Sequence, residues 1–180
     1  MGKSKRRGRW IAGSLIAGVA VLGVGLYWFQ PWKIWQDQSV REALPAARAT
    51  PPAGSAPTGA ATGPRTVARG SLISHEHTTS GTAAIIRLPD GSHTLRLEGL
   101  DTSNGPDLRV WLTDAPVKEG VAGWRVFDDG KYVSLGRLKG NKGDQNYEIP
   151  AGVNLSDYTS VTIWCDRFDV SFGAARLTAA

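Results

Sequence analysis

Residues 10–29 form an unbroken run of 20 residues without a charged side chain, and this run restricts the fold more than any other feature. As a helix it would span about 30 Å, the thickness of the hydrocarbon core of a bilayer. Five bases and no acids precede it: Lys3, Lys5, Arg6, Arg7 and Arg9. Because basic flanks stay on the cytoplasmic side, we predict a single-pass cell-membrane protein. The lipid bilayer is its partner through residues 10–29, residues 1–9 are cytoplasmic, and the C-terminal part is extracytoplasmic.

A cleaved signal peptide is the competing interpretation of this run. The apolar region of a signal peptide covers about 7–15 residues and ends at small residues. Here the run is longer, and the bulky Tyr27, Trp28 and Phe29 occupy the place where cleavage would fall. Trp32 and Trp35 continue an aromatic group of the kind found at membrane interfaces. The sequence therefore favours an uncleaved signal anchor.

The positive net charge of the chain is confined to its N-terminal head. The whole chain carries +5, whereas the part from Val67 onward has 12 basic and 14 acidic residues. Nucleic-acid-binding domains carry a basic patch or groove. The sequence therefore predicts no nucleic-acid partner.

A change in composition separates the anchor from a folded domain. Residues 45–64 are almost wholly Ala, Pro, Gly, Thr and Ser, with five prolines, and such segments bury too little apolar surface to fold. We expect a disordered Pro/Ala-rich linker there. The predicted division is a basic head (1–9), a transmembrane anchor (10–29), a juxtamembrane segment with the linker (30–66) and an extracytoplasmic domain (67–180).

Short alternating runs, separated by turn residues, fill the C-terminal domain. Glycine-containing connections at 88–92 and 139–144 are typical of hairpins. No window has the spacing of a long amphipathic helix. The fold class that we predict is all-β, an antiparallel β-sandwich preceded by one transmembrane helix.

The only cysteine of the chain, Cys165, lies in the most regular of these runs. Val161, Ile163 and Cys165 share one parity, and Phe168 to Ala174 alternate on the other. A period of two indicates a half-buried strand. We therefore expect the thiol at the end of a core strand, directed inward.

Six motifs follow one another in the domain: 77–82 (HTTSGT), 105–112 (GPDLRVWL), 135–140 (LGRLKG), 143–150 (GDQNYEIP), 158–165 (YTSVTIWC) and 168–177 (FDVSFGAARL). In this order and spacing they resemble the DM-thirteen family, also called the electron-transfer DM domain. The resemblance implies a β-sandwich related to DOMON and immunoglobulin-like domains, and a membrane or extracytoplasmic redox partner such as a b-type cytochrome. It also implies that Cys165 is the redox-active residue.

Two interpretations of Cys165 remain open from the residues themselves. A redox thiol needs an accessible thiolate, and the nearby Arg167 could supply positive charge. Asp166 and Asp169 would favour the protonated thiol. The alternative is a buried cysteine that packs as a small apolar residue.

The three histidines are candidate metal ligands. His75 and His77 would face the same way on a strand, and His93 follows closely enough to join them. A blue-copper arrangement is incomplete, because neither His nor Met follows Cys165. The alternative is that these histidines are solvated residues at strand ends.

No motif of a known catalytic type, such as G-x-S-x-G or H-E-x-x-H, occurs in the chain. The sequence leaves enzymatic activity open, favours no stand-alone enzyme and assigns no cofactor. The leading function is a membrane-tethered redox or electron-transfer accessory that uses Cys165. The second is a non-enzymatic binding or adhesion module with a structural cysteine.

Overall fold

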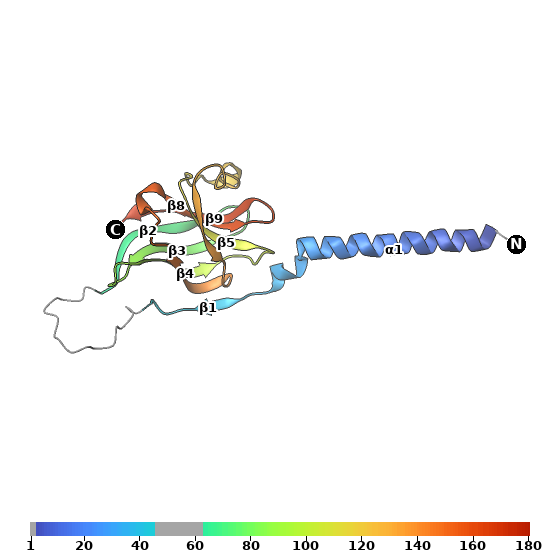
Figure 1. Ribbon diagram of the computed structural model, residues 1–180, viewed down its shortest axis with the longest axis horizontal. Helices are drawn as coiled ribbons and strands as arrows, with labels where there is room; N and C mark the ends of the chain where they lie inside the picture. Colours follow the sequence, from blue (N-terminus) through green and yellow to red (C-terminus); the bar gives the residue numbers. More distant parts are fainter. Residues whose placement is uncertain (1–2, 46–62) are drawn as a thin grey trace.

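The computed structural model describes residues 3–45 and 63–180 (Figure 1). The helical elements are α1 (Lys3–Phe29) and three short 3-10 helices, η1 (Pro31–Trp35), η2 (Gly120–Gly123) and η3 (Leu155–Asp157). The strands are β1 (Ser39–Arg41), β2 (Arg65–Ser74), β3 (Ser80–Arg87), β4 (His93–Asp101), β5 (Leu108–Thr113), β6 (Tyr132–Arg137), β7 (Lys142–Ile149), β8 (Ser160–Cys165), β9 (Val170–Arg176) and β10 (Thr178–Ala179).

Helix α1 projects away from one end of the β-rich domain, and the C-terminus lies at the other end (Figure 1). The segment Gly13–Lys33, which comprises most of α1 and the turn after it, is long and apolar enough to cross a membrane, with a mean hydropathy of 1.5. None of that apolar stretch is buried inside the protein. The predicted apolar helix is therefore present.

The strands form one strongly curled sheet in the order β1-β7-β4-β3-β2-β9-β8-β5-β6, with β10 paired to β2. Strand β2 belongs to both layers, because Arg65–Ser71 pair with β3 and Leu72–Ser74 pair with β9. All pairs are antiparallel except β1 with β7. The sheet therefore closes over itself as a sandwich, which confirms the predicted all-β fold class.

The main core lies between the two layers. One layer contributes Leu95, Leu97 and Tyr147, and the other contributes Val161 and Ile163. Cys165 belongs to the same cluster, so the inward parity predicted for the end of β8 is confirmed. Burial of such apolar side chains stabilises a fold by about 1.5–3 kcal/mol each.

The alternation predicted through β9 is wrong beyond Phe172. The pairing of β8 with β9 shifts register after Ile163 opposite Gly173, so that Trp164 pairs with Ser171. This bulge places an extra residue in β9, and an extra residue reverses the faces that follow it. As a result Ala175 reaches the main core, whereas Ala174 lies on the opposite face.

Strand β8 is buried on both faces, not on one as its alternation suggested. The outer face is covered by a second cluster that contains Trp111, Phe127 and Trp164. Phe127 belongs to the long connection between β5 and β6, which folds back over the sheet. The apolar residues of that connection supply the cover.

The segment before the linker takes part in the sheet. In β1, Val40 is opposite Gly143 of β7, and the amide of Glu42 donates to the carbonyl of Asp144 (2.9 Å). Gly143 has φ +97°, and a Cβ there would collide with the Val40 carbonyl. Only glycine therefore suits this approach. The predicted linker at 45–64 lies, for residues 46–62, outside the described part of the chain.

Candidate functional site

Cys165 ends β8, and the turn that follows it contacts the C-terminal end of α1 through Arg167. It pairs with Leu108 of β5 and Val170 of β9, and its side chain is fully buried. The tight turn that follows brings the amide of Phe168 to the Cys165 carbonyl (3.2 Å), and Asp169 takes a left-handed φ of +49°. The thiol is therefore held by a short, well-defined turn at the edge of the core.

Opposing influences act on the Cys165 thiol. Burial is the largest, and it raises the pKa of Cys165 above its ordinary value. The nearby backbone groups of Arg167, Phe168 and Asp107 act in the opposite direction and lower it. The negative charge of Glu76 raises the pKa further. The net result is a raised pKa, which favours the protonated thiol.

The guanidinium of Arg167 does not serve the thiol, contrary to the sequence-based expectation. It donates instead to the carbonyls of Tyr27 (3.3 Å) and Trp28 (2.8 Å) in the last turn of α1. The backbone of Arg167, not its guanidinium, is the part that lowers the pKa of Cys165. The sequence identified the residue near Cys165 but not the direction of its side chain.

A small cavity of about 110 Å³ lies between the end of α1 and the sandwich. Phe29 from the helix and Phe168 and Phe172 from the sandwich line it, and the rings of Phe29 and Phe168 stack at 5.7 Å. Phe168 and Phe172 also belong to the core around Cys165. The aromatic wall of this cavity is therefore continuous with the surroundings of the thiol.

His75 is a buried member of a polar chain. Its Nε2–H donates to the carbonyl of Lys118 (3.0 Å), so Nδ1 accepts from the Ser171 hydroxyl (2.7 Å). The Ser171 oxygen in turn contacts the Thr162 hydroxyl (2.8 Å). Burial lowers the pKa of His75. With both ring nitrogens used, this histidine offers no lone pair to a metal.

The other two histidines lie in different places. His77 packs on the Phe172 ring (3.9 Å between centroids) and lines the 110 Å³ cavity, and burial lowers its pKa. His93 begins β4 and pairs with Ile149. Among residues 3–45 and 63–180, no group of three His, Cys, Asp or Glu side chains is arranged to hold a metal ion. The three-histidine site stays a prediction, and the geometry does not assemble it.

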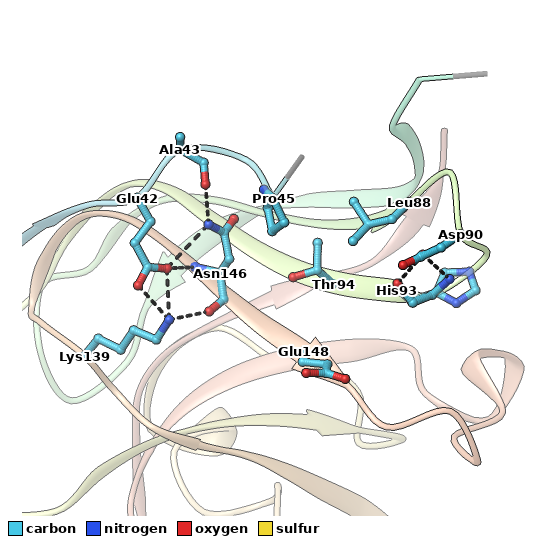
Figure 2. Close-up of a pocket in the computed structure, with 11 residues that line it drawn as sticks. Glu42, Ala43, Pro45, Leu88, Asp90, His93, Thr94, Lys139, Asn146 and Glu148 are labelled. Atoms are coloured by element: carbon cyan, nitrogen blue, oxygen red, sulfur yellow. Dashed lines mark hydrogen bonds and ion pairs between the residues drawn. The ribbon is translucent and has the colours of Figure 1, made fainter. Parts of the chain in front are cut away.

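Sequence reasoning missed a larger cavity of about 570 Å³ (Figure 2). It lies over β4 and β7, between the end of β1 and the β3–β4 hairpin. Its lining mixes charged, polar and apolar side chains, among them Glu42, Leu88, His93, Lys139 and Glu148. These residues are up to about a hundred positions apart in the chain, so no local sequence motif predicts the cavity.

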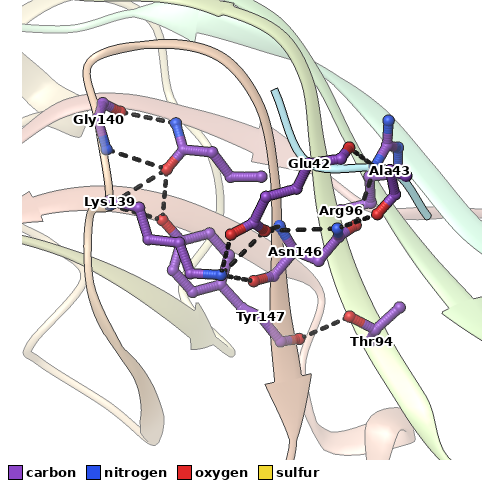
Figure 3. Close-up of polar contacts among 9 residues, drawn as sticks. Glu42, Ala43, Thr94, Arg96, Lys139, Gly140, Asn146 and Tyr147 are labelled. Carbon is purple, nitrogen blue, oxygen red and sulfur yellow. Dashed lines mark hydrogen bonds and ion pairs between the residues drawn. The ribbon is translucent and has the colours of Figure 1, made fainter. Parts of the chain in front are cut away.

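A hydrogen-bond network fastens the end of β1 to this cavity (Figure 3). Lys139 Nζ contacts both Glu42 carboxylate oxygens (2.7 and 2.9 Å), and the amide of Asn146 donates to the same carboxylate (2.7 Å). The hydrogen bond from Lys139 is the main reason that the pKa of Glu42 is lowered. Beside it, burial raises the pKa of Tyr147 to about 12. The network is structural in character, since its charges are paired.

The fold and the site together define an all-β domain joined to an apolar helix, with one buried thiol at the junction. Residues 71–177 match the family described as Electron transfer DM13, and the match covers more than half of the chain. The chain belongs to this family, as its motifs indicated, and its domain is an electron-transfer-related module. No match was found among curated proteins or among solved structures.

Proposed function

We propose that this protein is a membrane-anchored, extracytoplasmic electron-transfer accessory in which Cys165 is the redox group. Family membership supports the electron-transfer role. The apolar helix α1 and the basic residues before it support anchoring with the N-terminus in the cytoplasm. The partner is a membrane or extracytoplasmic redox protein.

The observation that carries the redox role is the position of Cys165, which lies directly before the turn that contacts the end of α1. Phe168 of that turn lines the 110 Å³ cavity between α1 and the sandwich and packs against the core that contains Cys165. A redox partner in the membrane would therefore meet the domain beside the thiol.

The chemistry follows from the single cysteine. Cys165 has no second cysteine in the chain, so the oxidised form cannot be an internal disulfide. With hydrogen peroxide as oxidant, the sulfur attacks one oxygen, the O–O bond breaks, and a sulfenic acid and water result. A partner thiol then attacks that sulfur, releases the oxygen as water and leaves a mixed disulfide.

The complete burial of Cys165 favours a second candidate. In that case the domain is a non-enzymatic binding or adhesion module, and the thiol is a small core residue. The 570 Å³ cavity beside Glu42 and Lys139 would be the binding surface. This volume is within the range of about 300–1,000 Å³ that is usual for ligand pockets.

Thiol labelling of the full chain in detergent separates the two candidates. If Cys165 is a redox thiol, a thiol reagent should modify it in the folded state, faster as the pH rises, because the thiolate is the reactive form. After peroxide treatment, a sulfenic-acid trap should add to the same residue. The Cys165→Ala variant is the control for both reactions. Reaction only in denaturant would reject the redox role and leave the binding module.

A further inference from the structure

The β8–β9 turn that follows Cys165 binds directly to the C-terminal end of α1. Arg167 Nη1 donates to the carbonyls of Tyr27 and Trp28, and its guanidinium lies 5.2 Å from the centre of the Trp28 ring. The last carbonyls of a helix lack partners within the helix, and a cation there is stabilising. The turn therefore acts as the cap of α1.

A second turn of the sandwich contacts the chain just after α1. Lys33 Nζ donates to the carbonyl of Pro106 (3.3 Å), and Asn104 Nδ2 donates to the carbonyl of Gln36 (3.2 Å). Both turns lie at the end of the domain that carries Cys165. Two separate attachments define an orientation, whereas one would leave the domain free to swing.

The connection between α1 and the sheet is too short to let the domain move far away. Only residues 30–38 separate Phe29 from β1, and five of them form η1. A 3-10 helix rises about 2.0 Å per residue and an extended chain about 3.3 Å, so the connection spans about 20–25 Å while η1 is formed. The domain must stay within that reach of the end of α1.

Aromatic side chains surround the end of α1 and are exposed to the outside of the protein. Tyr27 is 70 % exposed and Trp35 is 80 % exposed, and Trp28 and Trp32 are also exposed. Tyr and Trp side chains favour the interface between lipid and water. The charges at this end are of both signs and mostly paired: Arg109 and Arg137 contact Asp107, Arg109 also contacts Asp166, and Arg125 and Arg167 donate to backbone carbonyls. Aromatic insertion, not attraction to anionic lipid, is the interaction that such a surface offers.

We infer that this end of the domain is a lipid-binding surface, which rests on the headgroups of the bilayer around the exit point of α1. The β8–β9 turn and the turn at 104–107 then face the membrane, and the β3–β4 hairpin and the C-terminus point away from it. This inference rests on the part of the proposed function in which α1 crosses the bilayer. It places Cys165 at the membrane-facing end, where a partner embedded in the membrane would approach.

Spin labels at the two ends of the domain test this orientation in nanodiscs of neutral phosphatidylcholine. In a Cys165→Ala background, one label is attached at Asp166→Cys, beside the β8–β9 turn, and another at Gly152→Cys. Gly152 lies just after β7, and a Cβ there meets no other atom within 4 Å. A nickel-chelating lipid should relax the label at 166 several-fold more strongly than the label at 152. Equal relaxation at the two positions would overturn the inference.

Variants that weaken the contact between the β8–β9 turn and α1 provide the matched comparison. Arg167→Ala should reduce the relaxation at 166 at least two-fold, whereas Arg137→Ala, which removes an exposed arginine at the same end, should not. Phe29→Ala weakens the junction from the helix side, so it tests the same contact if Arg167→Ala fails to fold. Unchanged relaxation of the label at 166 in both Arg167→Ala and Phe29→Ala would contradict the inference.

Salt dependence and membrane retention complete the test. Contact of this end of the domain with the lipid should persist in 0.5 M salt, at which charge attraction is largely screened. Loss of contact would mean that charge attraction holds the domain there, and would overturn binding through the aromatic side chains. A chain that is not retained in the discs would instead reject the membrane anchor of the proposed function. Because Cys165 is absent from all these samples, a failure of its redox role cannot affect the outcome.

Discussion

At the scale of single residues, the buried His75 is the clearest case of a titratable group whose charge the fold excludes. Both ring nitrogens are committed, one to Lys118 and one to Ser171, in a pocket closed by the Phe127 ring. Burial lowers the pKa of His75. The unfolded chain therefore takes up a proton at a higher pH than the folded protein does.

We predict that this difference makes the protein less stable in mild acid. The stability that accompanies a lowered pKa is complete above the pKa of the unfolded chain, about 6.5. It is lost as the pH falls from there through the lower pKa of the folded protein. Urea unfolding between pH 7.5 and 5 should show the loss, at no more than about 1.4 kcal/mol per pH unit from this group. His75→Gln should flatten the slope, and some slope should remain because the pKa of His77 is lowered too. His93→Gln, outside this network, is the control. An unchanged slope in His75→Gln would contradict the assignment.

The same residues show how far local patterns reach. Alternation placed Cys165 at the end of a core strand, because strand parity depends on adjacent residues alone. The partners of His75 are 43 and 96 positions away in the sequence. No local rule connects them, so the sequence indicates only a candidate metal ligand or a solvated residue at a strand end, and not a buried hydrogen-bond chain.

At the scale of elements, the hairpin strands could be predicted and β1 could not. Strands β4, β5 and β8 are long enough for the alternation of their apolar residues to be visible. Strand β1 has three residues, and it pairs with β7 more than a hundred positions later. Its attachment depends on Glu42 reaching Lys139 and on glycine at 143, which the sequence shows only as ordinary polar and turn residues.

Substitution of Gly143 should detach β1. Gly143→Ala combines a positive φ with a collision against the Val40 carbonyl. Gly136→Ala is the matched control, since Gly136 has φ +117° but no atom within 4 Å of its Cβ. Both variants should lose about 1–3 kcal/mol from backbone strain. Only Gly143→Ala should also accelerate hydrogen exchange of the Glu42 amide, by at least ten-fold. Protection of that amide in Gly143→Ala would show that β1 pairing does not require this glycine.

At the scale of the whole molecule, the pairing of β1 changes what limits the distance between domain and helix. The sequence predicts a Pro/Ala-rich linker at 45–64 between the anchor and the domain, and such a linker would set this distance. Because β1 precedes that segment and pairs with β7, the connection from α1 to the sheet is residues 30–38. The proposed anchor and the electron-transfer domain are thus joined closely, and the long segment is an insertion between β1 and β2.

The orientation of the whole chain depends, in our proposal, on the bases that precede the apolar run. Replacement of Lys3, Lys5, Arg6, Arg7 and Arg9 by Gln removes the charge difference across the helix. A substantial part of the chains should then insert with the domain in the cytoplasm, because basic flanks set the orientation. Added protease should digest the wild-type domain in right-side-out membrane vesicles and leave that part of the variant protected.

The control for total charge replaces five bases of the domain by Gln, since residues far from the helix carry little weight in orientation. These bases are Arg69, Arg87, Lys118, Lys131 and Arg176. This control should be digested like the wild type.

The intact mass of the membrane-bound wild-type chain decides between anchor and signal peptide. A mass that includes the N-terminal helix supports the anchor, because only an uncleaved helix can hold the β8–β9 turn and its thiol at the membrane. A chain that has lost residues 1–29 would overturn the anchor and, with it, the membrane-facing position of Cys165.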